Sequence, residues 1–352
     1  MRQGLAWGMI AFGLAVSQGC GGPGFHDDLT ASNNAPPTVA KKVHLVGFDA
    51  SEPLVNALKA KKLRGVVVQD PFAMGELGVK TLVAHLEGKK VEATIDTGET
   101  LVTPDNLSDP KIASLLKPPR TANINDSPSG AKKKKWRVFV IPKGTTHEFW
   151  QTIHAGALKA ADDLGNVEIV WQGPEKEDDR LQQIQLVQTA AGSKVDGIVL
   201  APLDSRALVK PVEEAIAKGV PVVIIDSGLE SKKPLSYIAT NNYNGGSMAA
   251  RRLGEVLKGE GKIILLRYAV GSESTEQRER GFTETIAREF PKLTYLSDQE
   301  YAGSTPDSAQ QKSQSLISQF RGQVDGIFCP NESSTVGMLR ALDAAGLLAG
   351  GH

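Results

Sequence analysis

Short runs of apolar residues alternate along the chain with longer amphipathic segments, and this alternation is typical of an α/β fold. The runs are rich in Val and Ile at consecutive positions, as in parallel strands that are buried on both faces. Strands are predicted at 137–141, 167–172, 197–202, 220–226, 262–268, 293–302 and 324–330. Helices are predicted between them, at 148–165, 179–191, 206–218, 245–258, 275–289, 307–320 and 334–346. The pattern favours a doubly wound design in two sheets.

The order of the elements is unusual at both ends of the chain. The last block, 324–350, gives a strand, a polar turn and a helix, and the strand expected next, KVHLVGFDASEP at 42–53, lies near the amino end. Joining Gly351 to Lys42 restores an unbroken strand–helix alternation. We therefore expect a circularly permuted domain in which 43–48 and 324–329 are neighbours in one sheet. The amino block adds a strand at 43–48, a helix at 52–60, a strand at 65–69, a helix at 72–87 and an extended segment near 92–103.

The first 20 residues have the order of a secretory signal. Arg2 precedes an apolar run from Gly4 to Val16, which is too short to span a membrane stably and ends in small residues before Cys20. A cysteine at this point resembles a bacterial lipoprotein signal, in which Cys20 would be lipidated; the alternative is a plain signal peptide with an incidental thiol. Residues 21–41 are rich in Gly, Pro, Asn and Ser and are predicted to form a disordered tether. A similar composition over 104–135 predicts a second linker.

Composition and motifs exclude several functional classes. Lys plus Arg and Asp plus Glu number 40 each, so no net charge recruits nucleic acid or an acidic membrane face. The run Lys132–Lys135 has no interleaved aromatic residues and is expected to be solvated linker. No dinucleotide or P-loop motif occurs, no nucleophile–base set is evident, and the six His have no metal-ligand spacing. The sequence therefore predicts no catalytic residues, no cofactor and no metal, and the apolar context of Cys329 makes it a core residue.

Polar and aromatic side chains follow the carboxyl ends of several predicted strands. Ligands of open parallel sheets bind at that edge. Carboxylates, amides and a guanidinium match adjacent hydroxyl groups, and flat aromatic rings match the C–H faces of a sugar ring. The sequence thus predicts a polyol pocket, and the candidate residues are Phe48, Asp49, Gln69, His147, Phe149, Trp150, Asp226, Ser227, Arg278 and Asn331.

Each candidate also has a purely structural interpretation. Asp226 and Asn331 could cap the helices that follow them, because Asp and Asn are preferred N-cap residues. Phe149 and Trp150 could be core residues of their helix, and Arg278 could be a surface charge. Their shared position at one end of the sheets favours the pocket.

At these residues the chain resembles the periplasmic sugar-binding proteins of the ribose-binding (type I) family, the solute receptors of bacterial ABC transporters. The motifs that carry the resemblance are PKGTTHEFW at 142–150, DGIVLAPLDS at 196–205, VPVVIIDSG at 220–228, YIATNNYNGG at 237–246, QRERGF at 277–282, VDGIFCPNE at 324–332, HLVGFDAS at 44–51 and VVVQDPFAMGELGVK at 66–80. It implies two similar lobes that are joined by three crossovers and close on a sugar. By matching motif, lobe 1 would comprise 70–94 and 136–240, and lobe 2 would comprise 42–69, 95–118 and 241–350. Residues 119–135 would link the former termini.

The resemblance also implies contacts to the ligand. Phe149 and Trp150 would stack on the sugar, while hydroxyl groups would bond to Asp49, Gln69, Asp226, Arg278 and Asn331. The chain departs from the ribose receptors at His147, Ala201 and Ser227. The implied ligand is therefore a pentose, a deoxyhexose or a similar polyol.

The role that the resemblance implies is that of a monomeric receptor. It would act in the periplasm or on the outer face of the cell membrane, held there by a lipid on Cys20, and would deliver its sugar to an ABC permease. An alternative is a sensor domain that presents a sugar or autoinducer to a chemoreceptor or histidine kinase. A transcription regulator of this fold would need a helix-turn-helix where the export signal lies. A gene-assembly accident is a further alternative, and the signal placed ahead of residue 42 speaks against it.

Overall fold

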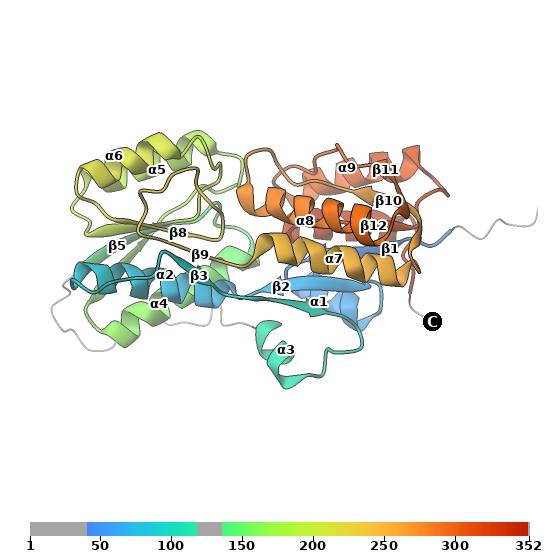
Figure 1. Ribbon diagram of the computed structural model, residues 1–352, viewed down its shortest axis with the longest axis horizontal. Coiled ribbons are helices and arrows are strands. Elements are labelled where there is room, and N and C mark those ends of the chain that lie inside the picture. Colours follow the sequence, from blue (N-terminus) through green and yellow to red (C-terminus); the bar gives the residue numbers. More distant parts are fainter. Residues whose placement is uncertain (1–40, 118–135, 351–352) are drawn as a thin grey trace, which may run out of the picture. The chain divides into compact units, whose positions relative to one another are not determined.

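The computed structural model describes residues 41–117 and 136–350, which form two six-stranded sheets flanked by helices (Figure 1). The predicted signal peptide with Cys20, the tether up to residue 40, and the linker with its lysine run lie outside the described residues. Lobe 1 is built on a sheet with the strand order β3 (Thr94–Asp96), β9 (Ser236–Ala239), β8 (Val222–Ile225), β7 (Gly197–Leu200), β5 (Trp136–Ile141) and β6 (Val167–Trp171). Lobe 2 is built on a sheet with the order β11 (Lys292–Ser297), β10 (Glu260–Leu265), β12 (Gly326–Phe328), β1 (His44–Phe48), β2 (Gly65–Gln69) and β4 (Glu99–Val102).

All strand pairs in the two sheets are parallel except β2 with β4. Their central strands are buried on both faces, as their continuous Val and Ile runs predict. The helices that pack on the lobe 1 sheet are α2 (Pro71–Leu86), α4 (Glu148–Leu164), α5 (Arg180–Gly192) and α6 (Val209–Ala217). Those of lobe 2 are α1 (Glu52–Lys59), α7 (Asn242–Val256), α8 (Glu273–Glu289), α9 (Pro306–Gln319) and α10 (Glu332–Ala344). A short helix, α3 (Pro110–Leu115), follows β4.

The first and last strands of the described chain are neighbours. β1 pairs with β12 in parallel, with His44 opposite Gly326 and Leu45 opposite Ile327. The pairing continues beyond the strands, where the Val43 N–H donates to the Leu347 carbonyl oxygen at 2.7 Å. The prediction that 43–48 and 324–329 lie side by side in one layer is confirmed.

The two sheets share one strand order when β1 and β2 are counted after β12. When the strands of lobe 1 are numbered in chain order from β5, the sheet from β6 to β9 holds the second, first, third, fourth and fifth strands side by side. When the strands of lobe 2 are numbered from β10, the sheet from β11 to β2 has the same order. This is the order of one common class of doubly wound folds, and it occurs in lobe 2 only when the chain is read in rotated order.

The amino block contributes to both lobes. α2 packs against α4 so closely that a Cβ on Gly75 would lie 2.0 Å from the Ile153 carbonyl oxygen, so this contact requires glycine. Within the described ranges the chain passes between the lobes three times, from β2 to α2, from β3 to β4 and from β9 to α7. Residues 42–117 are thus an integral part of each core.

Three predictions about the elements need correction. The extended segment predicted at 92–103 is two strands, β3 and β4, which lie in different sheets. This part of lobe 1 therefore ends at Asp96, the last residue of β3, and not at residue 94. β9 is a strand that the apolar pattern did not predict. The interpretation of 104–135 as solvated linker is wrong for α3, because Ile112 is buried in the core of lobe 2.

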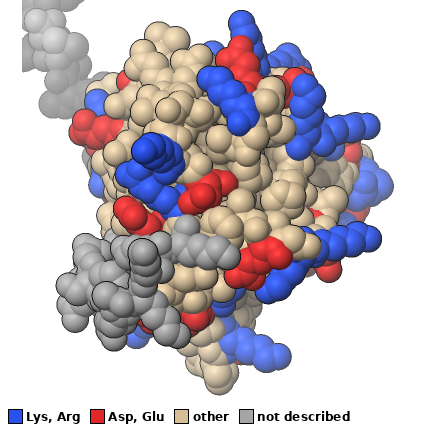
Figure 2. All heavy atoms as spheres, turned by 90° about the vertical axis from the view of Figure 1, so that its left-hand side faces the viewer, with Lys and Arg blue, Asp and Glu red and all other residues tan. Residues whose placement is uncertain are grey.

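No helix within the described ranges combines the length and apolar character that crossing a membrane requires. Basic and acidic side chains are interspersed on the face at the left-hand end of Figure 1 (Figure 2). That face therefore carries no extended patch of one sign.

Candidate functional site

Two aspartates occupy equivalent places in the two lobes. Asp226 follows β8 and Asp49 follows β1, and each of these strands is the fourth in its sheet by the shared order. Both residues have a left-handed backbone, with φ of 63° and 71°. Non-glycine residues seldom adopt this conformation, which costs roughly 1–3 kcal/mol and clusters at functional sites. Asp is among the few residues that tolerate it.

Both aspartates line one pocket between the lobes, here called the central pocket. Its lining residues surround about 330 Å³ of space between atoms, part of which is open to solvent. It is lined from lobe 1 by Lys143, His147, Phe149, Trp150, Glu177 and Asp226, and from lobe 2 by Asp49, Gln69, Tyr268, Ser272, Ser274, Thr275, Arg278, Asn331 and Glu332.

The lining includes most of the residues predicted from the sequence. The structure brings together Asp49, Gln69, His147, Phe149, Trp150, Asp226, Arg278 and Asn331. Two predicted residues do not line the pocket. The buried ring of Phe48 lies beneath the Arg278 guanidinium, 3.9 Å from its Cζ, and the Ser227 hydroxyl accepts a hydrogen bond from the Ser274 N–H at 3.0 Å. Both are turned away from the pocket to support residues of lobe 2.

A buried ion pair forms the lobe 1 wall of the pocket. Lys143 Nζ lies 2.9 Å from Asp226 Oδ2, and each side chain is only 4% exposed. Lys143 also donates to the Ser274 hydroxyl of lobe 2 at 3.1 Å. The ion-pair contact lacks hydrogen-bond geometry, and Asp226 Oδ2 accepts no hydrogen bond from the described residues. A buried carboxylate oxygen without such a donor is costly, so it is suited to accept a hydroxyl from a ligand.

Glu177, also on the lobe 1 side of the pocket, accepts from three donors. Its carboxylate contacts His147 Nδ1 and the Trp150 indole N–H, both at 2.6 Å, and the Tyr268 hydroxyl of lobe 2 at 2.5 Å. Burial opposes the charge of Glu177, but His147, Lys143 and the Tyr268 hydroxyl together lower its pKa to about 2. Burial likewise disfavours charged His147, and the Glu177 carboxylate outweighs it and raises the His147 pKa to about 9. The pair is therefore ionised at neutral pH.

This pair predicts a pH dependence of stability. The His147 pKa lies above its unfolded value of 6.5, so its contribution is complete below 6.5 and is lost as the pH rises through about 9. The Glu177 contribution is complete above 4.5 and is lost as the pH falls through about 2. In urea unfolding, His147→Gln should therefore flatten the decline in the unfolding free energy between pH 6.5 and 9. His85→Gln, at an exposed position of α2, should keep that decline; an unchanged decline in His147→Gln would refute the pairing.

Arg278 organises the lobe 2 wall. Its guanidinium donates to Gln69 Oε1 at 2.8 Å, to Asn242 Oδ1 at 2.8 Å and to the Pro330 carbonyl oxygen at 3.0 Å. Gln69 in turn donates to Asp49 Oδ1 at 2.7 Å, which fixes the carboxylate. Burial raises the pKa of Asp49, and Arg278 opposes that rise.

Asn331 combines its two predicted roles. It is the N-cap of α10, where its side-chain oxygen accepts from the Ser334 N–H, and it also lines the central pocket. Phe149 and Trp150 likewise both line the pocket, with their rings perpendicular and 4.9 Å apart.

Several lining residues were missed by sequence reasoning. Lys143 and Glu332 lie inside motifs at strand ends, and that position was the available signal. Glu177 lies in the loop after β6, and Tyr268 follows β10; neither residue type signals a ligand by itself.

The lobes are bonded to each other around the pocket. The start of α8 makes several of these contacts: the Gly228 N–H donates to Glu273 Oε2 at 2.9 Å, and the Ser205 N–H donates to the Gly271 carbonyl oxygen at 3.0 Å. The Ser304 hydroxyl donates to Asp178 at 2.9 Å. The structure is thus a closed form. Among the described residues no cluster of His, Cys, Asp or Glu is arranged to hold a metal.

Comparisons with known proteins agree with this architecture. The family model of the periplasmic binding protein domain matches residues 138–351. The chain is 26% identical over 181 residues to the xylitol-binding protein of Mycolicibacterium smegmatis, covering 51% of each protein. It is 27% identical over 240 residues to the ribose import binding protein of Bacillus subtilis, covering 66% of this chain and 73% of that protein.

A similar solved structure is a carbohydrate transporter solute-binding protein from Agrobacterium radiobacter in complex with D-arabinose. It has 33% identity and a TM-score of 0.58 over 61% of this chain and 74% of that one. The matches thus span from about half to three quarters of the length of these proteins, which are named as binding proteins and not as enzymes. The chain belongs to the periplasmic binding protein domain family and, within it, to the sugar-binding type I proteins.

Proposed function

We propose that the chain is an extracytoplasmic receptor that closes on one small polyhydroxylated molecule and delivers it to an ABC sugar transporter. The observation that carries this proposal is the pair of left-handed aspartates, Asp49 and Asp226, which face one closed pocket from equivalent strands of the two lobes. A ligand that bonds to both lobes favours the closed form by its differential affinity for it.

The other walls suit a polyol. Phe149 and Trp150 provide aromatic surface, and Asp226 Oδ2 offers an acceptor that receives no hydrogen bond from the described residues. Apolar surface with a few well-placed polar groups is typical of small-molecule sites. The related proteins named for xylitol, ribose and D-arabinose support the same class of ligand.

A panel of pentoses, hexoses, deoxyhexoses and sugar alcohols tests the proposal by thermal shift. We expect at least one member to raise the melting temperature, because a ligand at about 100 times its Kd stabilises the folded state by about 2.7 kcal/mol. The control is the Asp226→Ala variant, because a variant at an exposed residue would not test the pocket. No member of the same panel should raise the melting temperature of Asp226→Ala. A panel without any stabilising member would overturn the proposal.

We also propose that the chain is a circular permutation of the family's usual order. The family match begins at 138 and ends at 351, yet residues 44–48 and 65–69 supply the fourth and fifth strands of lobe 2. Val43 and Leu348 form a parallel bridge, so the end of the described chain lies beside the start of β1. A short link could restore the usual order without changing the packing.

A further inference from the structure

One buried carboxylate, that of Glu177, joins groups from both lobes at the central pocket. Its Oε1 accepts from the Trp150 indole N–H and lies against His147 Nδ1, both at 2.6 Å and both within lobe 1. Its Oε2 accepts from the Tyr268 hydroxyl of lobe 2 at 2.5 Å. Glu177 is 8% exposed and Tyr268 is 2% exposed. A single side chain thus connects two groups of the lobe 1 wall to the opposite lobe.

The chain around Glu177 is shaped to hold it. The segment after β5 is bonded to the loop after β6, where the Thr145 hydroxyl donates to the Pro174 carbonyl oxygen at 3.3 Å. A Cβ on Gly144 would lie 2.9 Å from Glu177 Cγ, so glycine leaves the room that this side chain occupies. The motif at 142–150 therefore places Glu177 as well as the two groups that contact it.

Tyr268 is anchored in lobe 2 through its backbone. Its N–H donates to Glu279 Oε1 at 3.1 Å, and its carbonyl oxygen accepts from the Gly303 N–H at 3.1 Å. Arg267 in turn lies 2.8 Å from the Glu279 carboxylate. Burial raises the pKa of Tyr268 well above its usual value, and the Glu177 carboxylate adds to the rise, so the hydroxyl keeps its proton. This hydroxyl is therefore a donor that moves with lobe 2.

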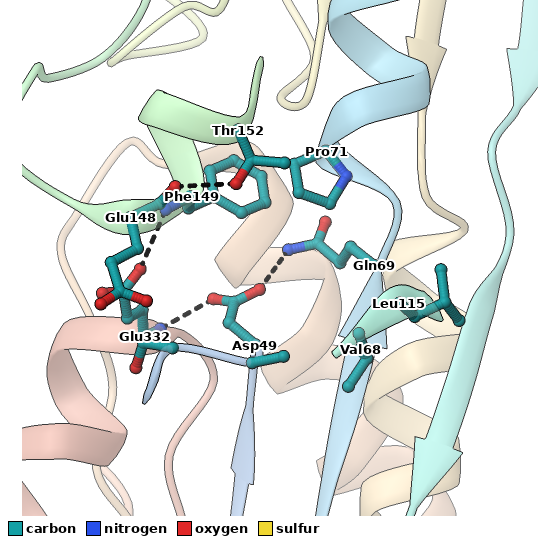
Figure 3. Close-up of a pocket in the computed structure, with 11 residues that line it drawn as sticks. Asp49, Val68, Gln69, Pro71, Leu115, Glu148, Phe149, Thr152 and Glu332 are labelled. Carbon is teal, nitrogen blue, oxygen red and sulfur yellow. Dashed lines mark hydrogen bonds between the residues drawn. The ribbon is translucent and has the colours of Figure 1, made fainter. Parts of the chain in front are cut away.

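Two other hydrogen bonds that cross between the lobes at the pocket are longer. The Phe149 N–H of lobe 1 donates to Glu332 Oε2 of lobe 2 at 3.4 Å (Figure 3). Lys143 of lobe 1 donates to the Ser274 hydroxyl of lobe 2 at 3.1 Å. The 2.5 Å bond from Tyr268 has the length of a charge-assisted O–H···O⁻ bond, which is about twice as strong as a neutral one. Of these three bonds, we expect it to contribute most to the closed form.

Closure completes the set of donors around Glu177. Separation of the lobes would remove the Tyr268 hydroxyl and leave the two lobe 1 donors in place. Hydrogen bonds in such a network polarise one another, so the loss of one weakens the hold on the others. The order of the lobe 1 wall therefore depends on closure.

We propose that Glu177 is a positioning residue for ligand recognition. In lobe 1 it orients Trp150 and His147, and its bond to Tyr268 makes release of the ligand depend on breaking a contact between the lobes. This inference rests on the proposed function and adds the residues that set how long the ligand stays bound. Because the contact forms only when the lobes meet, it slows dissociation and leaves the first encounter with the open form nearly unaffected.

Stopped-flow kinetics of the full chain with Tyr268→Phe tests the contact between the lobes. The probes are D-ribose, D-arabinose and xylitol, together with the member of the thermal-shift panel that stabilises the chain most. Phenylalanine keeps the ring and removes the hydroxyl. Dissociation should be about tenfold faster, and association should stay within about twofold, because a hydrogen bond to a charged group is lost from the closed form alone.

Tyr243→Phe is the matched control. The Tyr243 hydroxyl also donates to a carboxylate, that of Glu284, at 2.6 Å, but both residues belong to lobe 2 and neither lines the central pocket. Neither rate should change in this variant.

A double-mutant cycle assigns the effect to Glu177. Glu177→Gln keeps the size of the side chain and removes its charge, and it should speed dissociation by about tenfold or more. In the Glu177→Gln background, Tyr268→Phe should speed dissociation by less than about threefold, because the charged acceptor is already gone. Effects of the two substitutions that simply multiply would show that the residues act independently and would overturn the proposal.

The NMR resonance of the Trp150 indole N–H, assigned with Trp150→Phe, tests the orientation within lobe 1 without a ligand. A donor to a carboxylate at 2.6 Å should resonate downfield, because a short charge-assisted hydrogen bond deshields the proton. Glu177→Gln should move this resonance upfield, and Tyr243→Phe should leave it in place. An unchanged resonance in Glu177→Gln would contradict the positioning role.

The outcomes separate this inference from the receptor proposal. If a probe binds and Tyr268→Phe releases it as slowly as the unaltered chain does, the positioning role is overturned and the receptor proposal stands. Tyr268→Phe decides this alone if Glu177→Gln fails to fold. If neither the named probes nor any panel member binds the unaltered chain, the receptor proposal falls, and the inference falls with it.

Discussion

Replacing Asp226 by alanine is expected to weaken ligand binding by about a hundredfold or more while the chain stays folded. The substitution removes the buried carboxylate oxygen that accepts no hydrogen bond within 41–117 and 136–350, and hydrogen bonds to charged groups contribute about 1.5–3 kcal/mol. It also leaves the Lys143 ammonium buried without its partner, and breaking a buried pair in this way costs about 3–5 kcal/mol. Both effects disfavour the closed, liganded form. Calorimetry with the tightest ligand of the panel measures the loss.

Two further variants separate binding from backbone strain. Alanine at 226 must adopt a left-handed backbone, and so must alanine at Lys61, which has φ of 56° and does not line the central pocket. Lys61→Ala should therefore show only the effect of the left-handed backbone on stability and keep full affinity. Asp49→Ala removes the matching carboxylate of lobe 2 and should weaken binding as Asp226→Ala does. An affinity of Asp226→Ala within about threefold of the wild type would contradict the site.

Moving residues 42–117 to the other end of the chain is expected to preserve the fold. In this rearranged chain, 136–351 would be followed through a short linker by 42–117, because Val43 and Leu347 already share a 2.7 Å hydrogen bond. The packing of both lobes would be retained. The circular dichroism spectrum, melting temperature and ligand affinity should therefore stay close to those of the unaltered chain. Chain ends in loops are tolerated when the affected backbone is not buried.

The matched comparison is the truncated chain 136–352. It lacks β1, which pairs with β12, and it lacks α2, which packs on α4. The core of lobe 2 would lose Leu45, Leu54 and Leu58, and each buried Leu side chain contributes about 1.5–3 kcal/mol. We expect this chain to be unfolded by circular dichroism. A folded, ligand-binding truncation, or a rearranged chain that fails to fold, would contradict the permutation.

The apolar pattern predicted most of the fold, because buried parallel strands leave continuous runs of Val and Ile. β9 was not predicted, because it is short and because Ser236 and Tyr237 interrupt its run of apolar residues. The division of 92–103 between two sheets depends on tertiary pairing, with Ile95 opposite Ile238 and Leu101 opposite Val67. Local sequence does not encode that choice.

The site was predictable where strand topology fixes it. Asp49, Gln69 and Asp226 follow strands of parallel sheets, and the carboxyl ends of such strands meet at one edge. Lys143 was not selected because lysine is rarely buried unless paired, and its partner lies 83 positions away in the sequence. Phe48 was selected although it points to the core, since the alternation of faces at a strand end is ambiguous by one residue.

A crystal structure of the chain with the tightest ligand from the sugar panel tests the receptor proposal most directly. The account predicts one ligand molecule against the Phe149 ring, with hydroxyl groups bonded to Asp226 of lobe 1 and to Asp49 of lobe 2. A ligand that contacts only one lobe, or that binds outside the central pocket, would contradict it.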